Sequence, residues 1–339
     1  MTTYVGLDVS LKETSICIVD ENGMRIKEGI VPSDPDEIAG YLDKHAPSVH
    51  RVGLESGPTS SWLWRELKAR HLPVICIDAR HASAALSMQI NKSDRNDALG
   101  LARIMQTGWF RQVQIKSEES HRIRSLLNAR SLLVQMRRDI ENQIRGLFKS
   151  FGLVIGRANG GVFLKRAQDV VRQAPELADI VSPLLTAREA IDQQRLCLEN
   201  KIKRLARSNE QSRAFMTVPG VGPMTALAYL SCIDDPTRFT RSRTVGAYIG
   251  LTPRRYASGE IDWSGRISKC GDAMLRSYLF EAANVVLTRT KHTCSLKEWG
   301  MEIAGRSGGK KARVAIARKL ATILHRMWRD GTSFKWETA

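Results

Sequence analysis

Four acidic residues in the first third of the chain have types and positions suited to chemistry on phosphate: Asp8, Glu55, Asp94 and Asp97. Asp8 lies in an alternating segment, residues 4–9, whose apolar side chains share the opposite face, and Glu55 ends a second short apolar segment. Asp94 and Asp97 are three residues apart at the start of a helical pattern, so they share its apolar face. An unpaired carboxylate on a buried face is costly, which indicates that these acids have a ligand.

Magnesium would be a suitable ligand for the four acids. Hard divalent cations take oxygen ligands in near-octahedral geometry, and two of them about 4 Å apart can stabilise both the entering and the leaving oxygen of a phosphoryl transfer. The sequence therefore predicts a site for two Mg²⁺ ions. Each acid taken alone has a simpler structural explanation: Asp8 ends a strand, Glu55 precedes the turn at Gly57–Pro58, and Asp94 favours a helix N-terminus.

A second reactive segment covers residues 250–276. Two serines, Ser258 and Ser268, lie there beside glycines and among five cations: Arg254, Arg255, Arg266, Lys269 and Arg276. Arginine binds phosphate oxygens bidentately, and a serine in such surroundings could attack phosphorus. Serine is a weak nucleophile, however, and no Ser/His/Asp pattern supplies its activation. From these residues alone, a phosphate-binding loop in which Ser258–Gly259 only forms a turn is the simpler interpretation.

A third candidate is the segment Val218–Pro223, which holds Gly220 and Gly222 between two helical patterns. This arrangement is similar to the helix-hairpin-helix used for sequence-independent DNA binding, in which glycine amides and the next helix N-terminus accept a backbone phosphate. Pro-Gly-x-Gly is also a common turn. The later segment Gly305–Lys311 is not a Walker loop, because its spacing is one residue short and no Ser or Thr follows Lys310.

The elements that would position these residues fall into three segments, 1–112, 113–210 and 211–330. The first predicts an α/β domain, with three strands, a hairpin turn at Asn22–Gly23 and then alternating helices and strands. The third is mainly helical. The second has apolar residues at seven-residue intervals in two runs, which predicts a coiled coil: Leu126, Leu133, Ile140 and Leu147, then Leu184, Ile191, Leu198 and Leu205. Two ordinary amphipathic helices are the alternative.

Composition narrows the class of partner. The chain has 52 Lys and Arg against 35 Asp and Glu, a net charge of +17, which suits a polyanion. No apolar run approaches the ~20 residues needed to span a membrane and no signal-peptide pattern is present, which favours the cytoplasm over a membrane. The six cysteines are scattered without a C-x-x-C pair, which predicts reduced thiols rather than a zinc site or disulfides.

In combination these motifs resemble one family. The chain is similar to the DEDD-type insertion-sequence transposases of family one-hundred-ten, whose studied members are DNA recombinases guided by a bridge RNA. The resemblance rests on motifs that occur in family order: Gly6-Leu7-Asp8, Glu55, Lys92–Ala98, Pro219–Pro223, Gly250–Arg255, Ser258–Gly259 and Gly265–Lys269.

The resemblance implies a RuvC-like (ribonuclease-H-like) N-terminal domain, a coiled-coil insertion and a C-terminal transposase domain. It implies that the four acids are a magnesium-binding tetrad and that Ser258 joins covalently to a DNA strand. It further implies a composite site shared between subunits of a dimer or tetramer, target and donor DNA as substrates, and a noncoding guide RNA from the flank of the element. The expected location is the bacterial cytoplasm, in association with the nucleoid.

Three functions follow from these observations. The first is a recombinase in which the tetrad activates Ser258, and a phosphoserine conserves the energy of the phosphodiester bond without ATP. The second is a RuvC-like junction nuclease in which the metal activates water and Ser258 only holds phosphate. The third is a nucleic-acid-binding scaffold with an inactive acidic site.

Overall fold

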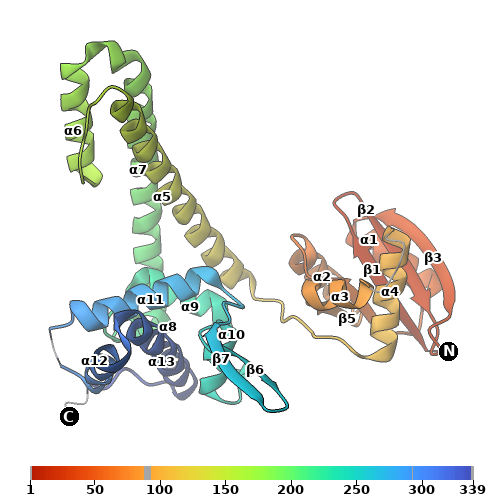
Figure 1. Cartoon of the computed structure of the whole chain (residues 1–339). Helices are drawn as coiled ribbons and strands as arrows, with labels where there is room; N and C mark the ends of the chain where they lie inside the picture. Colours follow the sequence, from red (N-terminus) through yellow and green to blue (C-terminus); the bar gives the residue numbers. More distant parts are fainter. Residues whose placement is uncertain (1, 88–92, 292, 337–339) are drawn as a thin grey trace. The chain divides into compact units, whose positions relative to one another are not determined.

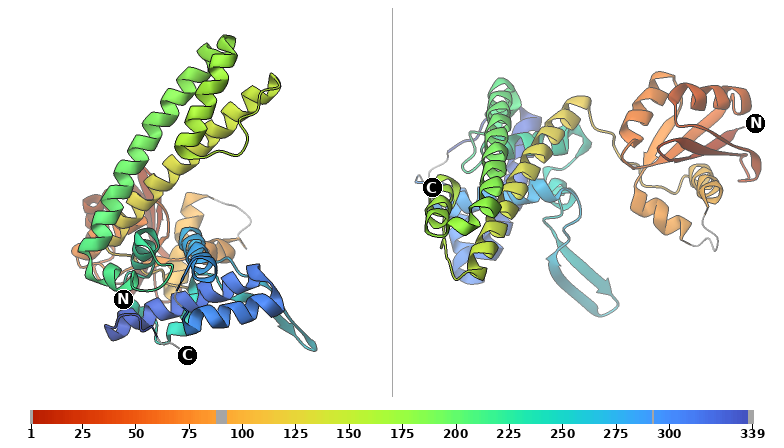
Figure 2. Two further views of the ribbon diagram at one scale, coloured as in Figure 1. Left: turned by 90° about the vertical axis from the view of Figure 1, so that its left-hand side faces the viewer. Right: turned by 90° about the horizontal axis from the view of Figure 1, so that it is seen from above.

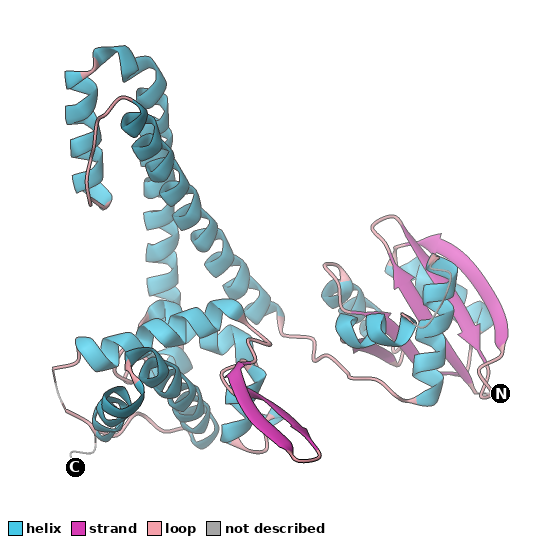
Figure 3. Ribbon diagram, in the orientation of Figure 1, coloured by secondary structure: helices cyan, strands magenta, loops and turns pink. Residues whose placement is uncertain are grey.

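The protein is described from a computed structural model that covers residues 2–87, 93–291 and 293–336. Two compact units divide the chain, Met1–Lys116 and Ser117–Ala339. The first unit combines a sheet with helices, whereas the second is mainly helical, as Figures 1 and 3 show. None of the helices in the described part of the chain is long and apolar enough to cross a membrane.

The first unit is built around a five-stranded sheet in the order β3-β2-β1-β4-β5. β1, β2 and β3 are antiparallel neighbours, whereas β4 and β5 run parallel to β1. The predicted order of three strands followed by alternating helices and strands is confirmed, and α3 is an addition to it. The elements are β1 (Thr3–Val9), β2 (Glu13–Val19), β3 (Arg25–Pro32), α1 (Pro35–His45), β4 (Val49–Glu55), α2 (Ser60–Ala69), β5 (Val74–Ile77), α3 (Ala79–Leu86) and α4 (Asp94–Thr107).

Helices cover both faces of this sheet (Figure 2). Val5 and Leu7 of β1 point to one face, where they join a buried cluster with residues of α1 and α2. Cys17 and Val19 of β2 pack on the other face against Ala98 and Ala102 of α4. Because successive strand residues point to opposite faces, Asp8 lies on the face that carries α4.

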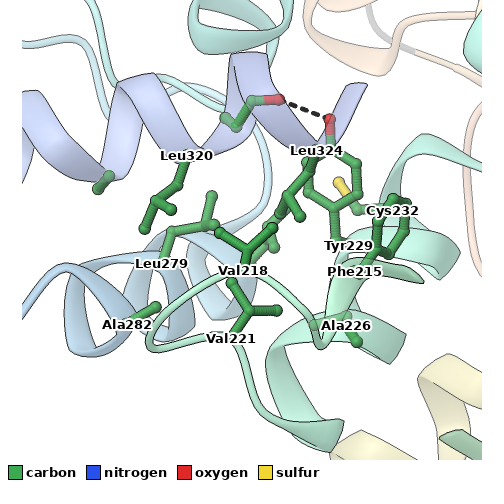
Figure 4. Packing of buried hydrophobic residues seen from close by; sticks show 14 of the residues in the cluster. Phe215, Val218, Val221, Ala226, Tyr229, Cys232, Leu279, Ala282, Leu320 and Leu324 are labelled. Atoms are coloured by element: carbon green, nitrogen blue, oxygen red, sulfur yellow. Dashed lines mark hydrogen bonds between the residues drawn. The ribbon is translucent and has the colours of Figure 1, made fainter. Parts of the chain in front are cut away.

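The second unit is helical apart from one hairpin. Its elements are α5 (Glu118–Ser150), α6 (Gly160–Gln173), η1 (Pro175–Leu177), α7 (Ala178–Ser208), α8 (Glu210–Phe215), α9 (Pro223–Ile233), η2 (Pro236–Arg238), η3 (Ser242–Thr244), α10 (Val245–Tyr248), β6 (Pro253–Ser258), β7 (Ile261–Ile267), α11 (Ala273–Thr288), α12 (Ser295–Ser307) and α13 (Gly309–Asp330). The core forms around α9, of which every residue from Thr225 to Ile233 is buried. Figure 4 shows this packing, in which Tyr229 Oη donates to the Ala321 carbonyl oxygen of α13 at 2.7 Å.

α5 and α7 pack against each other as an antiparallel pair within one chain. The residues that face each other recur at alternating spacings of three and four, with apolar side chains buried at both ends. These buried residues are Ile123, Leu127, Ile144 and Phe148 on α5, and Val181, Leu185, Ile202 and Ala206 on α7. The predicted heptad positions are partly buried rather than fully buried, and the coiled coil stays a prediction. Those positions are Leu126, Leu133, Ile140, Leu147, Leu184, Ile191, Leu198 and Leu205. Leu126 and Leu205 pack against one buried cluster, and Ile140 and Leu184 against another.

Charged residues fill the middle of this seam. Arg130 of α5 contacts Glu199 of α7 at 2.6 Å, and further along the pair Arg137 contacts Asp192 at 2.8 Å. The most buried pair is Glu141 with Arg188, at 2.9 Å. Arg195 links Asp192 to Glu199, at 2.8 and 2.7 Å. We call these ion pairs between α5 and α7 the charge ladder. Buried charges are costly unless they are paired, so the charge ladder stabilises one register and one direction of the two helices.

The charge ladder makes the helix pair sensitive to acid. Hydrogen bonds from Arg195 and Arg137 lower the pKa of Asp192. Burial raises the pKa of Glu199, but hydrogen bonds from Arg130 and Arg195 outweigh it, and the net shift is downward. A carboxyl group with a lowered pKa in the folded state stabilises that state above its unfolded pKa, and this contribution disappears as the pH falls through the folded pKa.

We therefore expect the α5–α7 pair to keep its stability from pH 7 to about 5 and to lose it progressively below the ordinary carboxyl pKa values. Hydrogen exchange of α5 and α7 amides, corrected for intrinsic exchange rates, would measure this loss. Asp192→Asn should weaken protection at pH 7 and flatten the pH dependence. The control is Asp139→Asn, on the exposed side of α5. Equal protection in the two variants would contradict the role of the charge ladder.

Candidate active site

The register of β1 and β4 places two of the predicted acids side by side. Gly6 pairs with Gly53 and Leu7 with Leu54 in this parallel ladder, so the next position brings Asp8 opposite Glu55. Residues paired in this way point to the same face of a sheet, and neighbouring strands lie ~4.8 Å apart. Asp8 and Glu55 are both half-buried, near the carboxyl ends of their strands.

Two glycines allow α4 to lie directly on this face. A Cβ atom at Gly6 would overlap the carbonyl oxygen of Ala98, and one at Gly53 would overlap the side chain of Met105. Both glycines share the face of Asp8 and Glu55, two residues earlier on each strand. Glycine is therefore required here for close approach of the helix, and Figure 1 shows α4 crossing the sheet.

The direction of α4 brings its first turn toward Asp8 and Glu55. Its last turns lie at the other end of the sheet, where Arg51 Nη1 donates to the Met105 carbonyl oxygen at 3.0 Å. There Gln106 Nε2 also donates to the carbonyl oxygen of Glu21 at 2.9 Å, in the turn before β3. The helix begins where Ser93 Oγ accepts from the Asn96 amide at 3.3 Å. Asp94 and Asp97 occupy that first turn, on the stripe that continues through Ala98, Leu101, Ala102 and Met105.

The carboxylate side chains do not form a ligand set in this structure. Within residues 2–87, 93–291 and 293–336, no group of three or more His, Cys, Asp or Glu side chains is arranged to hold a metal ion. Asp94 is exposed and Asp97 half-buried. Lys92, the first residue of the Lys92–Ala98 motif, lies outside the described residues. The four donors are all carboxylates, which suit a hard divalent cation, and the tetrad itself stays a prediction.

Hydrogen bonds of Ser56 and Ser60 hold the loop after Glu55, and neither serine was among the residues predicted from the sequence. Ser56 donates its amide to the Ile77 carbonyl oxygen at 2.9 Å, and its hydroxyl accepts from the Ala79 amide at 3.1 Å. Ser60 Oγ accepts from the Gly57 amide at 3.0 Å. Behind this loop, burial and, to a smaller extent, the charge of Glu55 raise the pKa of the Cys76 thiol to about 11, although a hydrogen bond with Ser60 lowers it. Cys76 is therefore an inert, neutral thiol, and the loop gives Glu55 a fixed backbone.

Ser258 lies at the tip of the β6–β7 hairpin. It pairs with Ile261 across the two-residue turn Gly259–Glu260, and Gly259 takes a φ of +57°. Glycine suits the first position of such a turn, where φ is positive. All six residues of β6 are exposed, so the Ser258 hydroxyl is accessible to a large ligand.

The structure separates the cations that the sequence groups with Ser258. Arg255 forms a bidentate ion pair with Asp262 across the hairpin, at 2.8 and 2.6 Å, and this hydrogen bonding lowers the pKa of Asp262. Arg276 donates to the carbonyl oxygens of Ile249, Cys270 and Gly271, at 3.0 to 3.2 Å. These two side chains therefore hold the hairpin and the loop that precedes α11.

The other members of this segment lie toward the base of the hairpin. Arg254 Nη2 donates to the Ser268 carbonyl oxygen at 3.2 Å, and Lys269 follows with a left-handed φ of +57°. Arg266 lies on β7, one residue before its end. Ser268 donates its amide to the Thr252 carbonyl oxygen at 2.8 Å, so it is ~20 Å from Ser258 along the strand. A single nest of cations around both serines is not formed.

Two aromatic residues share the hairpin face of Ser258, and sequence analysis did not identify them as functional. Tyr256 pairs with Trp263, and their rings stack with centroids 6.2 Å apart. Because strand side chains alternate, Tyr256, Ser258, Ile261 and Trp263 lie on one face. Both rings are more than half exposed. In the sequence, Tyr256 precedes Ser258 by two residues, and Trp263 follows Ile261 by two. This alternation around the turn is the pattern from which the position of both aromatic residues beside Ser258 could be predicted.

The two glycines of the predicted DNA-binding hairpin have different surroundings. α8, the Val218–Pro223 turn and α9 occur as predicted. Gly220 has a φ of +80°, and a Cβ atom there would overlap the Ala282 carbonyl oxygen of α11, so this glycine is needed for packing. Gly222 precedes α9 with open space beside it, and it is the better candidate for binding a phosphate.

Comparison with known proteins defines the class. A model described as "Transposase IS116/IS110/IS902 family" matches residues 212–297, and a transposase model of the DEDD type matches residues 5–152. Those ranges include the four acids in the first unit and the hairpin with Ser258 in the second. The protein is thus a transposase, an enzyme of DNA strand cleavage and transfer.

Relatives that match most of this chain extend this result. The transposase for insertion sequence element IS1111A of Coxiella burnetii is 31% identical, over 94% of this chain and 88% of the relative. A putative transposase of Sinorhizobium fredii is 30% identical, over 88% of this chain and 77% of the relative. The pilin gene-inverting protein of Moraxella lacunata is 24% identical, over 98% of this chain and 97% of the relative. The chain belongs to the IS110 family of DEDD transposases, a family type that suggests use of a divalent metal.

Close packing of α4 on glycine leads to a stability prediction. Gly6→Ala should destabilise the first unit by about 1–3 kcal/mol, the usual cost of overpacking, because the Ala98 carbonyl leaves no room for Cβ. Urea unfolding, followed by pulsed hydrogen exchange of peptides from residues 1–116, would measure it. Gly57→Ala is the control, since nothing lies within 4 Å of its Cβ position, and it should change stability by less than about 0.5 kcal/mol. Equal effects of the two substitutions would contradict the packing argument.

Proposed function

We propose that this transposase cuts and rejoins DNA strands through a covalent bond to Ser258, with Asp8, Glu55, Asp94 and Asp97 as a tetrad that binds Mg²⁺. The observation that carries the proposal is the shared placement of the acids. It is supported by the register of β1 and β4, which puts Asp8 beside Glu55 on one sheet face, and by the direction of α4, whose first turn carries Asp94 and Asp97 toward the same end.

The topology supports a ribonuclease-H-like fold for the first unit. Three antiparallel strands are followed by two strands parallel to β1, with the order β3-β2-β1-β4-β5. In such a sheet the acids of β1 and β4 point to the same face, and a following helix contributes the rest. A divalent cation bound there would offset negative charge on a DNA phosphate and favour loss of the serine proton.

The number of phosphate ester bonds stays the same throughout strand transfer. The Ser258 oxygen attacks phosphorus and forms a phosphoserine ester as the bond from phosphorus to one sugar oxygen breaks. The serine gives up its proton, and the departing sugar oxygen gains one. Attack by the hydroxyl of another strand then restores the serine and a phosphodiester bond. No external energy source is needed, because each step exchanges one phosphate ester for another.

The surroundings of Ser258 support activation from outside the hairpin. Its neighbours on the same hairpin face are Tyr256, Ile261 and Trp263, and none of these is a general base at neutral pH. The exposed tip suits insertion into a site completed by another element. We therefore include in the proposal a composite site, in which the tetrad and Ser258 come from different subunits of a dimer or tetramer.

A guide RNA is the remaining part of the proposal. A protein that contacts mainly phosphate and helix shape needs positive charge more than base-specific side chains, and the net charge of +17 suits that role. Base pairing by a noncoding RNA would then select target and donor DNA. The name of the Moraxella relative describes inversion of a gene, and inversion of DNA requires rejoining as well as cleavage. This favours recombination over a hydrolytic junction nuclease.

Substitution of the serine tests the covalent step. In a reconstitution with RNA from the flank of the element and both DNA partners, the wild-type protein should form a protein–DNA adduct that survives detergent. Ser258→Ala should reduce adduct and recombinant product by at least about a thousandfold, as expected when a nucleophile is removed. Ser268→Ala, at the base of the same hairpin, is the matched control and should retain both.

Two outcomes would overturn parts of this proposal. If Ser258→Ala cleaves as well as the wild type and no adduct forms, the chain is a nuclease that uses metal-activated water. If omission of the RNA leaves target choice and product yield unchanged, the guide RNA is not a partner.

The metal site leads to a separate expectation. Chelation should stop cleavage and added Mg²⁺ should restore it. Asp94→Asn or Asp97→Asn should lower the cleavage rate by on the order of a hundredfold, the usual effect of removing one group that stabilises transition-state charge, with DNA binding retained. Calorimetric titration of Mg²⁺ should show weaker binding in both variants. The control is Asp43→Asn, an exposed acid of α1, and a similar decrease in that variant would refute the assignment.

A further inference from the structure

Two adjoining cavities lie along the exposed side of α13. One has a volume of about 460 Å³ between α13 and residues 240–243, and the other a volume of about 550 Å³ between α12, α13 and residues 332–335. Lys319, Thr322 and Arg326 of α13 line both. The two cavities are therefore parts of one groove, called here the α13 groove.

The first part of the α13 groove is strongly basic. Six cations line it: Arg241, Arg243, Arg318, Lys319, Arg326 and Arg329. Within the described part of the chain, only Arg329 of these six forms an ion pair, to Asp330 at 2.8 Å, and no acid lines either cavity. Clustered like charges repel each other, and cations outnumber acids here, so this arrangement indicates an anionic ligand such as a phosphate backbone.

The second part of the α13 groove is aromatic and apolar. Trp299 of α12 and Phe334 line it together with Ile323 and Met327, and Trp299 is 38% exposed. Phe334 is held in place, because its amide donates to Thr217 Oγ1 at 3.1 Å. An exposed ring between fixed walls, next to a basic channel, is a platform on which an unpaired base can stack.

A buried histidine keeps the basic wall in place. His325 of α13 is fully buried, and its Nε2 lies 2.9 Å from the Pro236 carbonyl oxygen, which can only accept. Nε2 therefore donates, and in the neutral ring Nδ1 accepts from Ser242 Oγ at 2.9 Å. Ser242 lies between Arg241 and Arg243, so this hydrogen bond holds both arginines beside α13 before any ligand binds.

We infer that the α13 groove binds a single-stranded segment of nucleic acid, with phosphates in the basic part and an unpaired base on Trp299. A duplex would offer phosphates but no free base face, so it could use only half of the groove. Strand exchange and RNA pairing both expose unpaired nucleotides. The inference therefore rests on the proposed function for its class of ligand, but binding here requires neither Ser258 nor the tetrad.

Fluorescence anisotropy with the full chain can separate the two parts. The probes are a labelled twelve-nucleotide oligothymidylate, an oligouridylate of the same length, an abasic strand with the same phosphates, and a blunt-ended duplex without unpaired nucleotides. Trp299→Ala should weaken binding of the two base-containing strands by about tenfold, the usual effect of one stacked base, and leave the abasic strand and the duplex unchanged. Trp299→Phe should restore most of the affinity.

Removal of positive charge should act on every strand. The double substitution Arg243→Ala and Arg326→Ala should weaken binding of the base-containing strands and of the abasic strand to the same extent. The same double substitution should reduce the slope of log affinity against log salt by about 0.7 for each phosphate that the protein no longer neutralises. The controls are Lys311→Ala on α13 and Met301→Ala on α12, both exposed and outside the groove lining. Circular dichroism would verify that each variant is folded.

Three results would overturn the inference. In the first, Trp299→Ala weakens binding of the abasic strand as much as binding of the base-containing strands. In the second, the duplex binds more tightly than the single strands and is equally sensitive to the tryptophan and arginine substitutions. In the third, none of the groove substitutions changes binding. Preference for either the RNA or the DNA strand supports it. Because these binding measurements involve no strand cleavage or transfer, failure of the covalent mechanism would leave them unchanged and would be distinguished from failure of the groove.

Discussion

The close packing of α4 on the two glycines of β1 and β4 is the constraint on which the candidate active site depends. A side chain at Gly6 or Gly53 would lift the helix from the sheet. With glycine at both positions the helix lies directly on the strands, and its first turn reaches the strand ends that carry Asp8 and Glu55. The stability of this unit and the position of its acids thus depend on one packing interface. Phosphate chemistry requires such positioning, because electrostatic stabilisation is effective only when the charges are held in advance.

In the helix pair of the second unit, specificity of register is gained at a cost in stability. Arginines and acids occupy seam positions where apolar residues would contribute more to stability. What the charges contribute is specificity: a shift of one helix by a turn would separate Arg130 from Glu199 and leave Glu141 without Arg188. Polar residues at seam positions fix register in this way at a cost in stability. The apolar ends of the seam, near Ile123 and Phe148, provide the burial that offsets this cost.

The surfaces suited to nucleic acid are of two kinds. The β6–β7 hairpin exposes Ser258 beside Tyr256 and Trp263, with an internal Arg255–Asp262 pair that holds its shape. The α13 groove instead combines clustered cations with a partly exposed tryptophan, and a buried histidine fixes its basic wall. A reactive hydroxyl at an exposed hairpin tip can enter another site. A surface that binds a nucleic-acid strand instead requires side chains that are held in place before the strand binds. The two surfaces accordingly differ in how firmly they are packed.

The sequence by itself determined the local features: the strands and helices of the first unit except α3, the start of the helix at Asp94, the turn at Gly259 and the four acids near the ends of their elements. Periodicity and turn chemistry act over a few residues, so these features can be predicted from neighbours alone. Only the tertiary structure decided which helix positions form the α5–α7 seam, because Leu126 and Ile123 are equally apolar and the partner helix selects between them. It also decided that Arg255 and Arg276 hold the fold, that Gly220 faces α11, and that residues some eighty positions apart form the α13 groove. Such assignments depend on contacts between distant segments, which no local pattern encodes.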